Sequence, residues 1–171
     1  MGRYSFRDTV EDCKSISVFW LNKYDYFCGW KWGGMKWTNY AGEETGSIGF
    51  QVSVEGDEGY IRFQYTKTNR FSEEKEELDY KDRLASTPCN YGRKRWWFIC
   101  GLIVNGVYCG RRVGKLYLAP NGKYFGCRHC YNLTYESCRE SHRFDSMFKR
   151  MGLDLGVSPQ MVKKALQMRG L

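Results

Sequence analysis

Four cysteines in the second half of the chain have the type and spacing of a metal site. Cys127 and Cys130 form a Cys-x2-Cys pair after a predicted strand, and Cys100 and Cys109 form a pair separated by eight residues. A Cys-x2-Cys turn brings two thiolates to one zinc ion, and seventeen intervening residues suit the hairpin of a zinc ribbon. We therefore predict a zinc ion held by Cys100, Cys109, Cys127 and Cys130. Four thiolates leave no open coordination position, so the zinc would be structural.

Other assignments of the eight cysteines stay open at this point. Cys89 could replace Cys100 as a ligand. Cys138 and His142, which have Cys-x3-His spacing on a predicted helix, could pair with Cys127 and Cys130. The eight residues within the first pair must loop out of the site. Cys13 and Cys28 are expected to be buried as small apolar side chains.

The charge of the chain is divided unevenly between its halves. The net charge is +8, but residues 1–88 carry 12 Lys and Arg against 15 Asp and Glu, a net of −3. Residues 89–171 carry 15 Lys and Arg against 4 Asp and Glu, a net of +11. A cation excess of this kind is typical of proteins that bind a polyanion.

Cations and aromatic residues alternate around the predicted zinc site. In nucleic-acid-binding proteins, cations contact phosphates and exposed rings stack on bases. The alternative is that the rings belong to the core and the cations are solvated. The aromatic residues are Trp96, Trp97, Tyr117, Tyr124 and Tyr131. The predicted nucleic-acid contacts are Arg93, Lys94, Arg95, Arg111, Arg112, Lys115, Lys123 and Arg128.

The elements around these residues are predicted to be mostly strands. Gly33-Gly34 suits a two-residue hairpin turn, which would place Trp30, Trp32, Met35 and Trp37 on one face. Alternating apolar residues predict strands over 48–54 and 60–66, and further strands are expected over 78–84 and 95–99. Residues 111–118 and 123–125 flank a Pro-Asn-Gly turn, and helices are predicted over 135–151 and 159–168.

This order of elements predicts an α+β fold that is mainly antiparallel β. Three parts are expected: a Trp-rich antiparallel β domain over 1–88, a zinc ribbon over 89–135, and a helical tail over 136–171. Within the tail, residues 144–168 could form two helices of a helix-turn-helix, or a plain amphipathic extension.

The second half of the chain also resembles a known family. The matching segments are residues 83–84, 87–92, 95–100 (RWWFIC), 109–118 (CGRRVGKLYL) and 124–137 (YFGCRHCYNLTYES), together with the Trp-rich segment 29–38 and residues 46–49. They are similar to uncharacterised zinc-ribbon proteins of bacteria, phages and mobile elements, over most of residues 8–145; residues after Phe148 depart from the pattern. The resemblance implies the four-cysteine zinc site and a cytoplasmic location, and it implies no activity.

Several classes of function are disfavoured by the sequence. We expect no signal peptide, and we find no apolar run that could span a membrane and no nucleotide-binding or protease motif. We therefore expect a cytoplasmic, non-catalytic protein without a small-molecule substrate. A nuclease using Asp57, Glu58 and acidic residues of 73–82 is a weaker alternative. We expect a nucleic-acid-binding accessory or regulatory protein. The alternative is a protein-interaction module, such as a phage or mobile-element inhibitor of host defence or transcription, which an exposed aromatic patch on residues 20–37 would favour.

Overall fold

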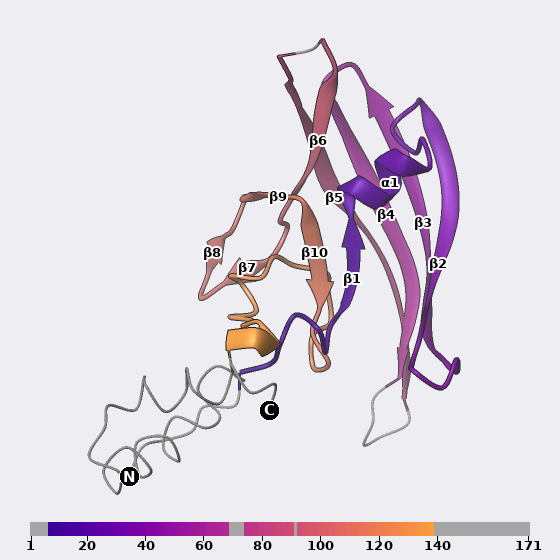
Figure 1. The fold of residues 1–171 in the computed structure, drawn as a ribbon, viewed down its shortest axis with the longest axis vertical. Coiled ribbons are helices and arrows are strands. Elements are labelled where there is room, and N and C mark those ends of the chain that lie inside the picture. The colour runs from indigo at the N-terminus through magenta and orange to yellow at the C-terminus, as the bar shows by residue number, and fades with distance from the viewer. Residues whose placement is uncertain (1–6, 69–73, 91, 139–171) are drawn as a thin grey trace, which may run out of the picture.

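A six-stranded antiparallel sheet forms the centre of the protein (Figure 1). The computed structural model describes residues 7–68, 74–90 and 92–138. All neighbouring strands of the sheet are antiparallel, which confirms the mainly antiparallel β character of the predicted fold. In spatial order the strands are β2 (Trp30–Thr38), β3 (Glu44–Glu55), β4 (Glu58–Thr68), β5 (Lys75–Pro88), β6 (Lys94–Ile99) and β9 (Arg112–Val113).

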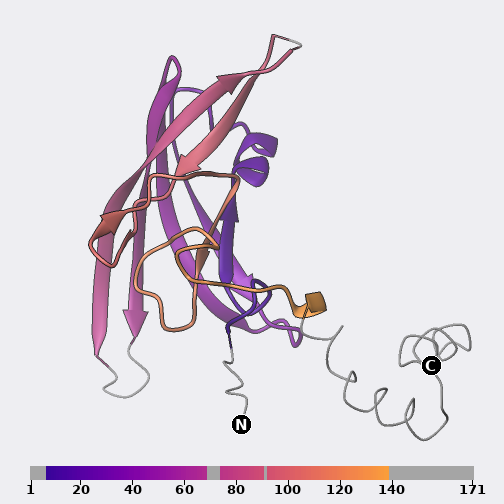
Figure 2. The ribbon, with the colours of Figure 1, turned by 90° about the vertical axis from the view of Figure 1, so that its left-hand side faces the viewer.

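A second layer covers one face of this sheet. Strand β1 (Lys14–Ser17) pairs with β10 (Lys115–Leu118), and helix α1 (Val18–Lys23) follows β1 directly. The helix begins there because the Ser17 side chain accepts a hydrogen bond of 3.1 Å from the N–H of Phe19. Figure 2 shows α1 and β1 on the same side of the sheet.

The core lies between these two layers. On β3 and β4 the side chains alternate, so that Phe50 and Phe63 are buried while their neighbours in sequence face outward. The second layer supplies the opposing apolar side chains. Its largest fully buried contributors are Ile16, Leu21, Leu116 and Phe125.

The predicted boundary at residue 88 falls between two hydrogen-bonded strands. Strand β5 ends at Pro88 and pairs with β6, with Leu84 opposite Phe98. Leu116 and Phe125 belong to the same core cluster as Ile16. Residues on both sides of position 88 therefore share one sheet and one core. Of the predicted helical tail, the described residues include only a short helical segment at 136–138; the predicted helices beyond it and the helix-turn-helix segment lie outside the described residues.

The predicted hairpin at Gly33-Gly34 is wrong. Residues Trp30–Thr38 form one continuous strand that pairs with β3, with Gly33 opposite Phe50 and Gly34 opposite Gly49. Neither glycine has a positive φ. Gly33 instead makes room for Tyr26: an added Cβ would lie 2.8 Å from two of its ring carbons. A close approach of a ring to the backbone explains this glycine as well as a turn would.

The continuous strand also separates the aromatic residues that a hairpin would have brought together. Alternation along β2 turns Trp37 toward the second layer, where its ring stacks on Phe125 at 6.3 Å between centroids. Trp30 and Trp32 point the other way and are 60% and 72% exposed. Exposed aromatic residues therefore do occur within 20–37, on the outer side of an edge strand.

The predicted strand 111–118 is interrupted at Gly114. Its first part is β9 in the large sheet, and its second part is β10, which pairs with β1. The predicted turn after β10 is present, with Gly122 N–H donating to Ala119 O at 2.8 Å. Residues 123–125 form no strand, and the chain returns through a single bridge between Gly126 and Tyr117. No helix in the described part of the chain has the length and apolar character needed to cross a membrane.

Candidate metal centre and the predicted cations

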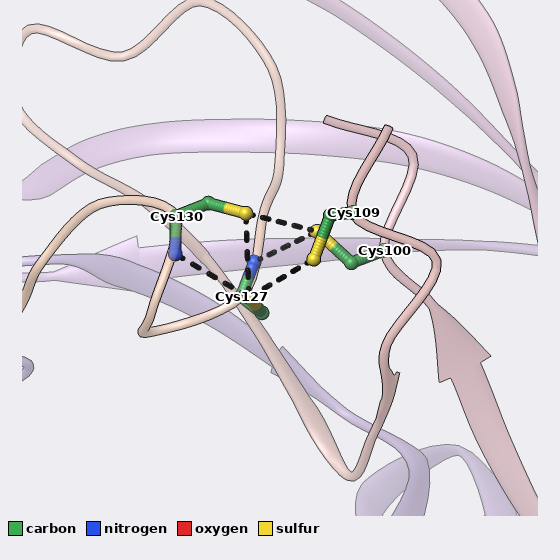
Figure 3. A group of neighbouring side chains, drawn as sticks. All are labelled: Cys100, Cys109, Cys127 and Cys130. Carbon is green, nitrogen blue, oxygen red and sulfur yellow. Dashed lines mark hydrogen bonds between the residues drawn. The ribbon is translucent and has the colours of Figure 1, made fainter. Parts of the chain in front are cut away.

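The four predicted ligands converge. Their sulfur atoms all lie within 4.8 Å of one another, and Figure 3 shows them turned toward a common centre. The Sγ–Sγ distances are 3.8 Å for Cys100–Cys130, 3.8 Å for Cys109–Cys127 and 3.5 Å for Cys127–Cys130. A tetrahedral site with metal–sulfur bonds of about 2.3 Å requires sulfur atoms roughly 3.8 Å apart. The cluster can therefore hold one metal ion.

The first pair is held by the end of β6 and a small hairpin. Cys100 follows β6, and its N–H donates to Arg111 O at 2.9 Å. The residues between Cys100 and Cys109 loop out as strands β7 (Ile103–Val104) and β8 (Val107–Tyr108), as their number requires. Asn105 and Gly106 connect these strands with φ of 53° and 78°, the two positive values of a tight Asn-Gly turn.

Cys127 and Cys130 lie in a tight turn whose backbone N–H groups donate hydrogen bonds to sulfur atoms. The Cys127 N–H donates to Cys100 Sγ at 3.3 Å, and the Cys130 N–H donates to Cys127 Sγ at 3.4 Å. Such bonds stabilise thiolates once a metal has replaced their protons. The turn is anchored by the two hydrogen bonds between Tyr117 and Gly126, of 2.7 and 2.9 Å, which link it to β10.

Burial makes the metal-free site unfavourable for charged sulfur. It raises the pKa of the Cys100 thiol to about 11, and it also raises that of Cys130. Burial acts in the same direction on Cys109, but hydrogen bonds from the Arg111 backbone and the neighbouring thiols outweigh it, and the net pKa is lowered. Without a metal the Cys100 and Cys130 sulfurs would carry protons, so metal binding must release protons.

The alternative ligands lie elsewhere. Cys89 is exposed at the turn between β5 and β6, so the length of β6, roughly 20 Å, separates it from the cluster. Cys138 is exposed and outside the cluster, and His142 lies outside the described residues. Cys13 is half-buried, with its Sγ donating to Thr9 O, whereas Cys28 is exposed and not buried as expected.

The eight predicted nucleic-acid contacts do not form one patch. Arg93, Lys94 and Arg95 lie at the end of β6 that is remote from the sulfurs. Lys115 lies on β10, opposite Ser17. The cations nearest the metal centre by chain position are Arg111, Arg112 and Arg128, each within three residues of a cysteine ligand.

Acidic partners distinguish these cations further. Lys94 pairs with Asp57 at 2.7 Å, and Lys123 pairs with Glu76. For the other six cations, the described residues supply no acidic partner within ion-pair distance. Arg128 lies 5.0 Å from the Tyr135 ring centroid, and Arg95 lies 4.3 Å from that of Trp97. Arg111 lines a pocket of about 280 Å³ together with His129 and Tyr108.

The predicted stacking rings are divided between core and surface. Trp96 is buried and stacks on Phe27 at 5.2 Å, so it belongs to the core. Trp97 faces the opposite side of the sheet and is half-buried. Tyr117 is buried, and Tyr124 is partly exposed. The Tyr131 hydroxyl donates to Tyr124 O, which holds the Tyr131 ring against the loop.

Two exposed features lie outside the predicted nucleic-acid contacts, and only the aromatic residues of 20–37 in the second were anticipated. The β7–β8 hairpin exposes Ile103, Val107 and Tyr108 by 68%, 70% and 53%. The outer side of the large sheet carries aromatic and cationic residues on β2, β4 and β5. The Asn-Gly turn could have indicated the hairpin, because it is flanked by apolar pairs. No family model, curated protein or solved structure matches the chain.

Proposed function

We propose that this protein is a zinc-stabilised, non-catalytic nucleic-acid-binding protein that acts as a cytoplasmic accessory or regulatory factor. The observation that carries the proposal is the set of arginines beside the metal centre, Arg111, Arg112 and Arg128, for which no described acidic residue serves as a partner. Cations that are not neutralised within the protein remain available to phosphate. The net charge of +11 in residues 89–171 supports a polyanion as the partner.

Zinc is the metal that best fits four clustered thiols. Soft thiolate ligands in a tetrahedral arrangement favour zinc or an iron–sulfur cluster, and the sulfur spacing near 3.8 Å suits a single ion. Cys100, Cys109, Cys127 and Cys130 would hold it. The zinc would supply no reactive position, and its role would be to fix the β7–β8 hairpin and the Cys127–Cys130 turn to the sheet. The arginines adjoining both segments would then be presented on a rigid support.

The test compares arginines without acidic partners with lysines that have them. Arg111→Ala/Arg112→Ala/Arg128→Ala and the control Lys94→Ala/Lys123→Ala each remove positive charge from predicted contacts. Fluorescence anisotropy over a salt series measures the affinity for labelled DNA and RNA. We expect the arginine variant to reduce the slope of log K against log salt by about 0.7–0.9 per lost phosphate contact. The control should change the slope much less, because its cations are already paired.

Two results would contradict this function. One is the absence of measurable binding to single- or double-stranded DNA or RNA at low salt. The other is an equal loss of affinity per charge removed for the three-arginine variant and the two-lysine control, which would mean that only total charge matters.

A second candidate function is a protein-interaction module, such as an inhibitor of host defence or transcription carried by a phage or mobile element. The exposed apolar β7–β8 hairpin and the exposed Trp30 and Trp32 favour it, because exposed apolar clusters mark partner sites. The test is a pull-down with nuclease treatment that compares wild type, Ile103→Ser/Val107→Ser and the loop control Tyr40→Ser. A stoichiometric protein lost only from the hairpin variant would support this candidate, and the absence of any nuclease-resistant partner would oppose it.

A further inference from the structure

Figure 2 shows that one face of the large sheet is turned away from α1 and β1. The strand register places aromatic and cationic residues on this face. We call the outward-facing residues of β2, β3, β4 and β5 on this side the open face. Trp30 and Trp32 are its most exposed aromatic members, at 60% and 72%. Large aromatic side chains exposed side by side cost solvation without adding to the core, so their position suggests a bound partner.

Strand register arranges the open face in two adjacent rows across four strands. In one row Trp30 lies opposite Ser53, Ser53 opposite Tyr60, and Tyr60 opposite Arg83. In the next row Trp32 lies opposite Gln51, Gln51 opposite Arg62, and Arg62 opposite Lys81. The eight residues comprise three aromatic rings, three cations and two uncharged polar side chains. Neither row contains an acidic residue.

The cations of the open face are closer together than sheet stability favours. Arg62 lies directly opposite Lys81, and like charges in that position are destabilising. Arg62 is neutralised by Asp79 of the flanking row, through hydrogen bonds of 2.6 and 2.5 Å. The described residues offer Lys81 no acidic partner within ion-pair distance, and its ammonium lies 4.3 Å from the Tyr60 ring centroid.

Arg83 also remains accessible. Its only described ion pair, to Glu58, spans 3.6 Å, and the two side chains are 70% and 78% exposed. An exposed pair of this length contributes little and is easily exchanged for another anion. Lys81 and Arg83 can therefore contact phosphates next to Tyr60.

We propose that the open face binds single-stranded nucleic acid, with bases stacked on Trp30, Trp32 and Tyr60 and phosphates held by Lys81 and Arg83. Residues two apart on a strand lie about 7 Å from one another, and Trp30 and Tyr60 lie two strands, roughly 10 Å, apart. The rings are thus spread over a surface instead of forming one apolar patch. Bases within a duplex are stacked on each other and cannot reach such rings, whereas unpaired bases can. A purely apolar protein partner would leave the interleaved cations unpaired.

This inference shares its ligand class with the proposed function but names a separate surface, so the two can fail separately. The experiment uses the full chain and measures anisotropy with labelled oligothymidylate, oligouridylate and a DNA duplex of equal length. Trp30→Ala/Trp32→Ala is compared with Tyr24→Ala/Tyr40→Ala, which removes two exposed rings outside the open face. Thermal melting checks that each variant is folded, and Trp32→Phe tests whether a smaller ring preserves binding.

We expect the tryptophan variant to weaken single-strand binding by roughly five- to a hundredfold and to leave duplex binding unchanged. The tyrosine control should bind like wild type, and Trp32→Phe should retain most of the affinity. Lys81→Ala/Arg83→Ala should weaken single-strand binding and lower its salt slope by about 0.7 for each lost contact.

Four results would overturn the inference. If the tryptophan variant matches the control while the Arg111, Arg112 and Arg128 variant loses binding, the open face is not the site and the proposed function stands. An equal loss of single-strand and duplex binding would remove the single-strand preference. If no nucleic acid binds to wild type, both proposals fail. If the tryptophan variant keeps its nucleic-acid binding but loses a protein partner in the nuclease-treated pull-down, the open face is a protein-docking surface.

Discussion

Asp82 places a carboxyl group on the core side of β5, against the backbone of Gly101. It is 6% exposed, and its Oδ2 has no hydrogen-bond partner among the described residues. Burial raises the pKa of Asp82 from 3.8 to about 7, because the charged form loses its hydration. The proton on Asp82 therefore stabilises the folded state fully below about pH 4. This stabilisation is lost as the pH rises through 7.

Replacing this carboxyl group tests that dependence. Wild type should lose stability relative to Asp82→Asn as the pH rises from 5 to 8. We expect the difference in free energy of unfolding between the two proteins to change by on the order of 2–3 kcal/mol over this range. Urea unfolding at several pH values measures the difference between the two proteins, in which pH effects on the thiols cancel. If the free energies of unfolding of the two proteins change with pH in parallel, Asp82 does not titrate in this range.

Single residues also show what spacing can and cannot predict. The clustering of Cys100, Cys109, Cys127 and Cys130 was predictable because a Cys-x2-Cys pair, a second pair and an intervening turn form a pattern that few other structures require. The burial of Asp82 was not predictable, because Asp82 lies between Lys81 and Arg83 in what resembles a solvated run of charged residues. The pairing of Lys94 and Lys123 with acids was also hidden, since Asp57 and Glu76 are distant in sequence.

At the scale of elements, the two glycines of β2 differ in the space available for a side chain. Gly33 faces Tyr26, whereas an added Cβ at Gly34 would find its nearest neighbour, the Ile48 carbonyl oxygen, at 3.4 Å. Gly33→Ala should lower the free energy of unfolding by about 1–3 kcal/mol, because the ring must move. Gly34→Ala should change it by less than about 0.5 kcal/mol, and the loss of chain entropy in the unfolded state favours the alanine.

Denaturant unfolding of the two variants distinguishes a strand from a turn at this position. A type I′ Gly-Gly hairpin turn would require positive φ at both residues and would make Gly34→Ala costly as well. Equal losses for the two variants would therefore contradict the continuous strand.

Element prediction succeeded where alternation was strong and failed where glycine had two explanations. The strands at 48–54, 60–66, 78–84 and 95–99 are all present, within β3, β4, β5 and β6. The pair Gly33-Gly34 indicates a turn locally, but pairing with β3 along the whole strand determined the outcome. Gly114 divided another predicted strand because its two parts join different sheets.

At the scale of the whole molecule, the candidate metal centre and the sheet share strands and core. Strand β6 pairs with β5 at one side and leads directly into Cys100 at its end. Trp37 of the edge strand β2 stacks on Phe125, two residues before Cys127. We expect loss of the metal to weaken the sheet, because metal binding free energy contributes to folding.

Two probes test this coupling. Tryptophan fluorescence reports on the sheet, and a chromophoric chelator reports on metal release during denaturation. The two transitions should coincide, as expected for one cooperative unit. Clearly separated midpoints would indicate that residues 1–88 and 89–135 unfold as independent domains, as a division of the chain at residue 88 would require.

Fold class was predictable from composition and alternation, but the joining of the two halves was not. The pairing of β1 with β10 connects residues about a hundred positions apart, with Ile16 opposite Leu116. No local pattern in either segment specifies its partner. The open face was hidden for the same reason, because its rows depend on the register of four strands.

The most direct test of the metal centre is native mass spectrometry of the purified protein after brief treatment with a thiol-alkylating reagent. Cys28 and Cys89, which are exposed, serve as reference thiols in the same chain. We predict one zinc ion per chain, with Cys28 and Cys89 modified and Cys100, Cys109, Cys127 and Cys130 protected by coordination. A metal-free chain whose four clustered cysteines react as readily as Cys28 and Cys89 would contradict the metal centre.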